Sequence, residues 1–131
     1  MQVVTFTDTT ASCWFQWKLG GGWSDTDDII FSMAYTSSVG GGNIRWQLEY
    51  WTISDGGDTT PASSPTATTL ETVAAPAAIE TNKSITTTTL IIANADISAT
   101  DTVICKLTRL GDDALDTNTG KIYLSDLIAC Q

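Results

Sequence analysis

The 131-residue chain has no histidine and only six basic residues. Without histidine it lacks the side chain that most often serves as a general base, activates a serine or cysteine nucleophile, or binds transition metals. Fifteen acidic residues give a net charge of -9, which argues against an interface that neutralises phosphates. We therefore expect no binding to nucleic acid or to anionic membranes.

Long hydrophobic runs are also missing. No apolar stretch approaches the roughly 18 residues of a membrane span, and the first ten residues, MQVVTFTDTT, have neither the basic nor the apolar region of a signal peptide. The three cysteines, Cys13, Cys105 and Cys130, are spread along the chain without a CxxC pair. We expect reduced thiols that act as small core residues rather than a disulfide framework or a zinc site.

The usual catalytic motifs are absent: there is no GxGxxG, GKS/T, GxSxG or HExxH. Two carboxylates alone could hydrolyse a glycoside, but Glu49 is the only acidic residue in the middle of a strong strand pattern, and no second carboxylate lies at a readable spacing. Aspartates cluster in the loops 25–28, 55–58 and 112–116, yet none fits the EF-hand pattern, and solvated turns explain them. We expect no enzyme, no metal and no cofactor.

What the chain does contain favours sheet. Threonine is abundant, β-branched and aromatic residues recur, and no helical period lasts longer than one or two turns. Short alternating segments are separated by glycine, aspartate and proline. The pattern predicts an all-β fold, an antiparallel jelly-roll-like β-sandwich of about eight strands. The strands that we expect are residues 13–19, 29–35, 43–53, 67–73, 83–92, 101–110 and 121–129.

The domain organisation that we expect is an N-terminal arm, residues 1–12, followed by a single β-sandwich domain, residues 13–131. One core at this length can bury roughly two thirds of the surface of the unfolded chain. The glycine triplet at 40–42 predicts that the segments 29–35 and 43–53 pair as antiparallel neighbours through a flexible connection.

Alternation within the strands assigns side chains to faces. Trp51 is left on the polar face of its strand, and we expect a neighbouring subunit or an overlying loop to cover it. The positions expected to face the core are Ile44, Trp46, Leu48 and Tyr50, then Val103, Cys105 and Leu107, and finally Ile122, Leu124 and Ile128.

The other tryptophans leave two interpretations open. Trp14 and Trp17 fall on opposite faces of one strand, and Trp23 begins a loop. Packing in the core or in a subunit interface would explain them, because tryptophan is enriched in both places. Exposed coplanar tryptophans would instead form a platform on which a carbohydrate can stack.

Two segments carry a family resemblance. DDIIFSMAYTSSVGGGNIRWQLEYWTISDGGD (27–58) has a hydrophobic strand, a Gly-Ser stretch and an Asn-Ile-x-Trp-x-x-x-Tyr strand closed by Asp-Gly. DISATDTVICKLTRLGDDALDTNTGKIYLSDLIA (96–129) has an Asp-x-Val strand, an arginine, an acidic Gly/Asp/Thr loop and a Leu-rich last strand. In this order of elements the chain resembles a recurrent β-domain of structural proteins of tailed bacteriophages. The resemblance covers most of residues 13–129 and is patchy in the Thr/Pro-rich middle.

The resemblance implies a jelly-roll module of a virion, made in the host cytoplasm and often trimeric. A small domain that begins close to Met1 fits a capsid decoration (cement) protein on the capsid exterior; the alternatives are a tail-fibre or receptor-binding virion domain and a carbohydrate-binding module. The expected partners are further copies of the chain, as a homotrimer, and major capsid or other virion proteins, with a glycan if the domain binds a receptor. The candidate interface residues are Val3, Val4, Phe6, Trp14, Trp23 and Trp51, together with the loop 55–65.

Overall fold

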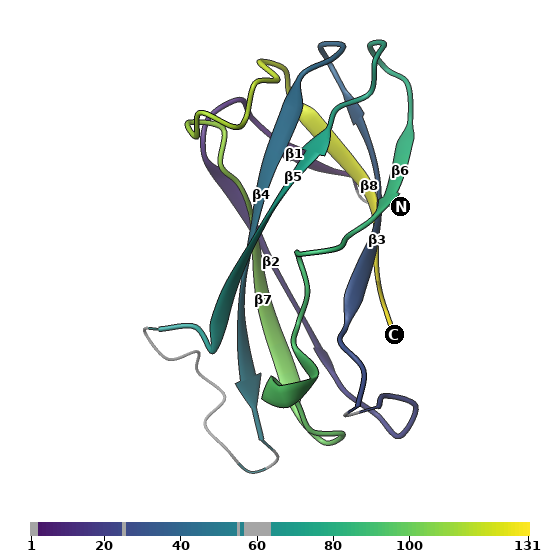
Figure 1. Ribbon diagram of the computed structural model, residues 1–131, viewed down its shortest axis with the longest axis vertical. Helices are drawn as coiled ribbons and strands as arrows, with labels where there is room; N and C mark the ends of the chain where they lie inside the picture. Colours follow the sequence, from purple (N-terminus) through teal and green to yellow (C-terminus); the bar gives the residue numbers. More distant parts are fainter. Residues whose placement is uncertain (1–2, 25, 55, 57–63) are drawn as a thin grey trace.

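The architecture follows from strands that each have one apolar face. The computed structural model describes residues 3–24, 26–54, 56 and 64–131. Within that part of the chain, eight strands form two antiparallel sheets, with strand orders β1-β8-β3-β6 and β2-β7-β4-β5 (Figure 1). The elements are β1 (Val4–Phe6), β2 (Ala11–Lys18), β3 (Ile30–Ser37), β4 (Asn43–Ile53), β5 (Ala67–Ala74), β6 (Lys83–Thr86), the 3₁₀ turn η1 (Asn94–Asp96), β7 (Thr102–Arg109) and β8 (Ile122–Cys130).

The order of the strands is that of a jelly roll. Only β4 and β5 are neighbours both in sequence and in one sheet; every other connection crosses from one sheet to the other, and the last two strands of the chain lie between earlier ones. Two four-stranded sheets linked in this way are the double Greek key of jelly rolls. The predicted fold class is therefore confirmed. No helix in the described residues is long and apolar enough to cross a membrane.

The expected pairing of the segments 29–35 and 43–53 is wrong. β3 pairs with β8 and β6 in one sheet, whereas β4 pairs with β7 and β5 in the other. A connection that crosses between the sheets lets the apolar faces of β3 and β4 meet each other in the core, which side-by-side pairing would not do.

The long strand expected at residues 83–92 is also shorter than predicted. β6 ends at Thr86, and the hydroxyl of the buried Thr87 accepts a hydrogen bond from the Phe31 amide and donates one to the Leu90 carbonyl. The chain then turns inward, so that Leu90 and Ile92 are buried although they lie outside a named strand. Hydrophobic side chains of a loop can thus pack in the core when a buried hydroxyl forms hydrogen bonds with the backbone amide and carbonyl groups there.

The core contains the side chains that alternation assigns to it in β4 and β7. Ile44, Trp46, Leu48 and Tyr50 are at most 1% exposed, and Val103, Cys105 and Leu107 are equally buried. Phe6 joins them: its ring meets that of Trp46 edge-on, with 4.9 Å between centroids. Part of the expected N-terminal arm is therefore strand β1 of the sandwich, because burying the Phe6 ring stabilises the fold.

A β-bulge in β8 reverses the prediction for Ile128. Ala34 lies opposite Asp126 and Tyr35 opposite Leu124, which leaves Ser125 as the extra residue. Such an insertion exchanges the two faces of the strand beyond it. Leu124 faces the core before the bulge, but after it Leu127 packs against the core and Ile128 is 52% exposed.

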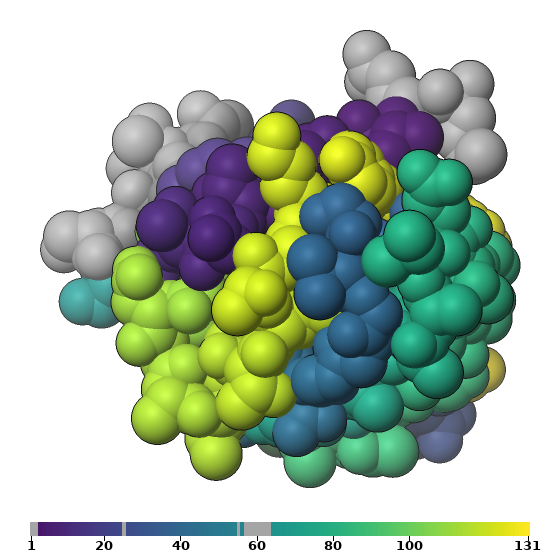
Figure 2. All heavy atoms as spheres, turned by 90° about the horizontal axis from the view of Figure 1, so that it is seen from above, coloured from purple at the N-terminus to yellow at the C-terminus, as the bar shows by residue number. Residues whose placement is uncertain are grey.

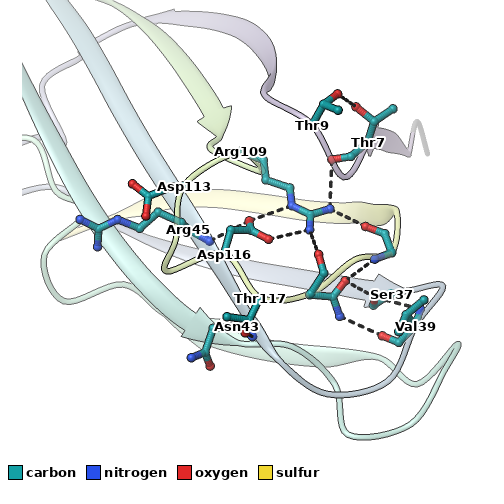
Figure 3. Close-up of polar contacts among 12 residues, drawn as sticks. Thr7, Thr9, Ser37, Val39, Asn43, Arg45, Arg109, Asp113, Asp116 and Thr117 are labelled. Atoms are coloured by element: carbon teal, nitrogen blue, oxygen red, sulfur yellow. Dashed lines mark hydrogen bonds and ion pairs between the residues drawn. The ribbon is translucent and has the colours of Figure 1, made fainter.

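A buried arginine connects the loops at one end of the sandwich (Figure 3). The Arg109 side chain is fully buried and forms an ion pair with Asp116, at 2.8 Å between Nη2 and Oδ1. Its Nε donates to Asp116, its Nη1 to the carbonyls of Thr7 and Gly120, and its Nη2 to Asp116 and the carbonyl of Asn118. All five guanidinium donors thus have acceptors, as a buried charge requires.

Asn118 extends this network to the β3–β4 connection. Its Nδ2 donates to the carbonyls of Val39 and Gly41, at 2.9 and 2.7 Å. Gly111 sits so close to the β1–β2 turn that a Cβ atom there would lie 2.2 Å from the Asp8 carbonyl oxygen. Figure 2 looks onto this end and shows the segments packed side by side without an opening between them.

Replacing Arg109 should strongly destabilise the fold. Arg109→Leu leaves the buried Asp116 carboxylate without its cation and three carbonyls without donors, and breaking a buried pair costs roughly 3–5 kcal/mol. Urea denaturation followed by tryptophan fluorescence measures the loss. The control is Lys121→Leu, at an exposed position in the β7–β8 connection, which also contains Asp116. It should change stability by no more than about 0.5 kcal/mol. Equal effects of the two substitutions would contradict a structural role for the Arg109 network.

Candidate functional site

The six predicted interface residues fall into two groups. Phe6 and Trp51 are buried, at 1% and 8% exposure. Phe6 points into the core of its own chain, so it offers no surface to a partner, and its assignment to an interface is corrected. Val3, Val4 and Trp14 are exposed at 52%, 36% and 56%, and Trp23 is half-buried. The loop 55–65, apart from residues 56, 64 and 65, lies outside the described residues, as does Asp25 of the aspartate clusters.

Trp51 is covered at least in part by its own chain. The Trp14 ring stacks against it with 5.2 Å between centroids and 25° between planes. The two residues come from β2 and β4, which are separated by β7, so their rings meet across the middle strand. Ile104 of that strand lies opposite Trp51 and is 7% exposed. Part of the cover expected from a neighbouring subunit or an overlying loop thus comes from Trp14, two strands away in the same sheet. Trp14 is the more exposed member of the pair and the one that a partner could reach.

These residues belong to the outer face of the β2-β7-β4-β5 sheet. The register places Lys106 opposite Trp14 on one side and opposite Glu49 on the other. The Lys106 ammonium lies 3.4 Å from the Glu49 carboxylate and 5.7 Å from the centroid of the Trp14 ring. We call this surface the tryptophan face; it consists of Ser12, Trp14, Gln16, Lys18, Arg45, Gln47, Glu49, Trp51, Ile104, Lys106 and Thr108.

A second surface lies at the open edge of the sandwich. β1 pairs with β8 only at the residues Ile122–Leu124, and no described strand pairs with that edge of β8 beyond Leu124. Among the described residues, the edge of β2 that faces away from β7 also has no partner strand. Because β1 is short, the gap between β2 and the second half of β8 stays uncovered.

Two adjoining hollows of about 250 and 310 Å³ lie in this gap, and Phe15 and Leu127 line both of them. Phe15 and Trp17 stack at 6.0 Å between centroids, and Trp23 lies against Trp17 at 6.2 Å. We call this surface the edge groove; it consists of Cys13, Phe15, Trp17, Trp23, Leu127 and Ala129.

The edge groove is mainly apolar, although Ser125 and Asp126 line one of its two hollows. Burial raises the pKa of the Cys13 thiol above its ordinary value of 9.0, and burial raises that of Cys105, in the core behind it, to about 12. Both thiols are therefore protonated near neutral pH, and the thiol form is a poor nucleophile and a poor metal ligand. In the part of the chain that the structure describes, no group of three or more cysteine, aspartate or glutamate side chains could hold a metal ion.

The sequence indicates the residues of the groove but not the groove itself. The alternation of Cys13, Phe15 and Trp17 places them on the inward face of β2, as the structure shows. Their partial exposure depends on the brevity of β1 and on the bulge at Ser125, which turns Leu127 toward them. Neither feature has a signal in the local pattern.

Comparisons with known proteins add no assignment. The chain matches no protein-family model, no curated protein and no solved structure. The tryptophan face and the edge groove are therefore the features from which we infer a function.

The raised pKa values predict how the thiols react. Iodoacetamide modifies the thiolate, so Cys13 in the native protein should react slowly at pH 8, and its rate should keep rising above pH 9. Cys105, which is fully buried, should remain unmodified until the protein is unfolded. Peptide mass spectrometry after timed labelling measures each site, with labelling in urea as the control. A Cys13 rate that levels off below pH 9, or rapid modification of native Cys105, would contradict this assignment.

Proposed function

We propose that the chain is a virion structural protein of the capsid decoration type, which associates with copies of itself and with coat subunits through the edge groove. The observation that carries the proposal is the free edge of β8 beside the aromatic groove. The order of motifs in residues 27–58 and 96–129, which resembles phage structural β-domains, supports it, and so does the jelly-roll fold, which viral capsid proteins use. Because one fold serves many functions, the proposal depends mainly on the edge groove and the free edge of β8, and less on the fold.

A free strand edge is a template for pairing with another chain. Its unpaired amide and carbonyl groups can accept a further strand, and proteins usually protect such edges with charges, bulges or covering loops. In β8 the bulge at Ser125 and the charge of Asp126 protect the start of the free edge. The four side chains from Leu127 to the end of β8 at Cys130 carry no charge, so this stretch remains open to a partner strand.

The groove provides the apolar contact that pairing alone would lack. Trp17 and Trp23 present large rings at low cost in side-chain entropy, and tryptophan is enriched among residues that dominate binding energy. A stable interface buries about 1,000 Å² or more, which exceeds what the groove can supply. The exposed Val4 and Ile128 line its hollows and would extend the contact area. Val3, which precedes Val4, is also exposed.

The proposal predicts binding to capsids. The purified chain should bind capsids of its own phage that lack it and raise the temperature at which they release DNA. Trp23→Ala should weaken this binding about tenfold or more, because it removes a ring from the groove. Co-sedimentation measures the affinity, light scattering the oligomeric state, and circular dichroism the fold of each variant.

Ile79→Ala is the matched control, because Ile79 is 61% exposed in the β5–β6 connection, away from the groove. It should bind capsids like the unmodified chain. Equal capsid stability with and without the protein would exclude the decoration role. Attachment to host cells without any binding to capsids would indicate the receptor-binding alternative instead.

A further inference from the structure

Trp14 is the most exposed aromatic ring on the tryptophan face. It is 56% exposed, while Trp51 beside it is 8% exposed and holds it in a stack at 5.2 Å. A ring fixed in this way loses little conformational entropy when a ligand stacks on it. The rest of this face is mainly polar, although Leu70, opposite Gln47 on β5, is also 40% exposed. Such a surface favours a partner that is itself part apolar and part polar.

Polar side chains surround the ring in register. Gln16 lies two residues along β2 from Trp14, Lys106 lies opposite Trp14 on β7, and Glu49 and Gln47 follow on β4. Amide, carboxylate and ammonium groups together offer both donors and acceptors to hydroxyl groups. The core of a protein interface, in contrast, is depleted in charged residues. The mixture of one aromatic ring with a polar surround matches a sugar, which has an apolar C–H face and hydroxyl groups at its rim.

Basic residues outnumber acidic ones on the described strands of this face, in contrast to the whole chain. Lys18, Arg45 and Lys106 project from it beside the single acid Glu49, on a protein of net charge -9. Among the described acidic residues, only two others lie in strands. Glu71 turns inward to accept hydrogen bonds from the amides of residues 88–90, and Asp126 belongs to the other sheet.

We propose that the tryptophan face binds a saccharide in which isolated carboxylates are spaced among neutral sugars. A pyranose ring stacks on Trp14, its hydroxyl groups bond to Gln16 and Gln47, and a neighbouring carboxylate lies against the Lys106 ammonium, which Glu49 holds in place. A densely charged polymer such as a nucleic acid is disfavoured, because the net charge of -9 repels it at every position away from this face. The site adjoins the edge groove, because Trp14 also lines one of its hollows, but it does not depend on the decoration role.

The test uses glucuronoxylan and xanthan, in which glucuronic acids are spaced among neutral sugars, together with the same polymers after reduction of their carboxylates to alcohols. The unmodified protein should bind at least one native polymer in affinity electrophoresis, and carboxyl reduction should weaken binding about tenfold or more. Added salt should weaken binding to the native polymer and leave residual binding to the reduced one unchanged.

Two pairs of variants assign the binding to this face. Trp14→Ala should abolish it, whereas Ile79→Ala, at a similarly exposed position in the β5–β6 connection, should not change it. Lys106→Gln should weaken binding to the native polymer alone, whereas Lys83→Gln, which lowers the net charge equally but lies in β6, should have no effect.

Failure to bind either native polymer would overturn the proposal. Equal binding to native and reduced polymers would overturn the role of the carboxylate. Preferred binding to a single-stranded oligonucleotide, or loss of capsid binding in Trp14→Ala without any polymer binding, would show that the face serves another partner. None of these results depends on whether Trp23→Ala affects capsid binding, so the two proposals can fail independently.

Discussion

The buried Arg109 guanidinium is the interaction on which the shape of the molecule depends. Removing a cation from water is costly, and the cost is offset only because Asp116 and three carbonyls satisfy all five of its donors. One of those carbonyls belongs to Thr7, directly after β1. Arg109 therefore fixes where β1 ends and where the turn to β2 begins. With β1 anchored at this end of β8, the rest of that edge is left without cover.

The edge groove follows from this anchoring together with the bulge at Ser125. Were β8 regular, Leu127 would point outward and Ile128 would fill the gap between the sheets. The bulge turns Leu127 and Ala129 toward Phe15 and Trp17 instead. A leucine and an alanine leave more room beside these rings than an isoleucine would, which is consistent with the hollows found there.

The sequence predicts those parts of the fold that depend on short-range alternation. In β4 and β7 every residue assigned to the core is buried, because a one-residue slip would place the whole apolar set in solvent. Prediction from the sequence fails where contacts between residues far apart in the chain determine the structure. The bulge in β8 is defined by pairing with β3, about 90 residues away, and β3 and β4 separate into two sheets because their partners lie elsewhere in the chain.

For the candidate sites, alternation along the strand placed Trp14 and Trp17 on opposite faces but did not show which of the two rings stays exposed. That outcome depends on Trp51, which reaches Trp14 across β7 in the folded sheet only. Glu49, which looks isolated in the sequence, has its partner Lys106 on the adjacent strand.

The two surfaces use different parts of the sandwich and need not compete. The edge groove opens between the sheets, along the free edges of β2 and β8, whereas the tryptophan face looks away from the core on the β2-β7-β4-β5 sheet. They meet at β2, whose residues alternate between the two surfaces: Phe15 and Trp17 line the groove, and Trp14 and Gln16 belong to the face. Trp14 also lines one hollow of the groove and so lies where the two surfaces adjoin. A partner strand beside β8 would leave the outer side of β2 uncovered. Because successive side chains of β2 point to opposite faces, one small domain would be able to bind a protein at its edge while its outer face remains available for a saccharide.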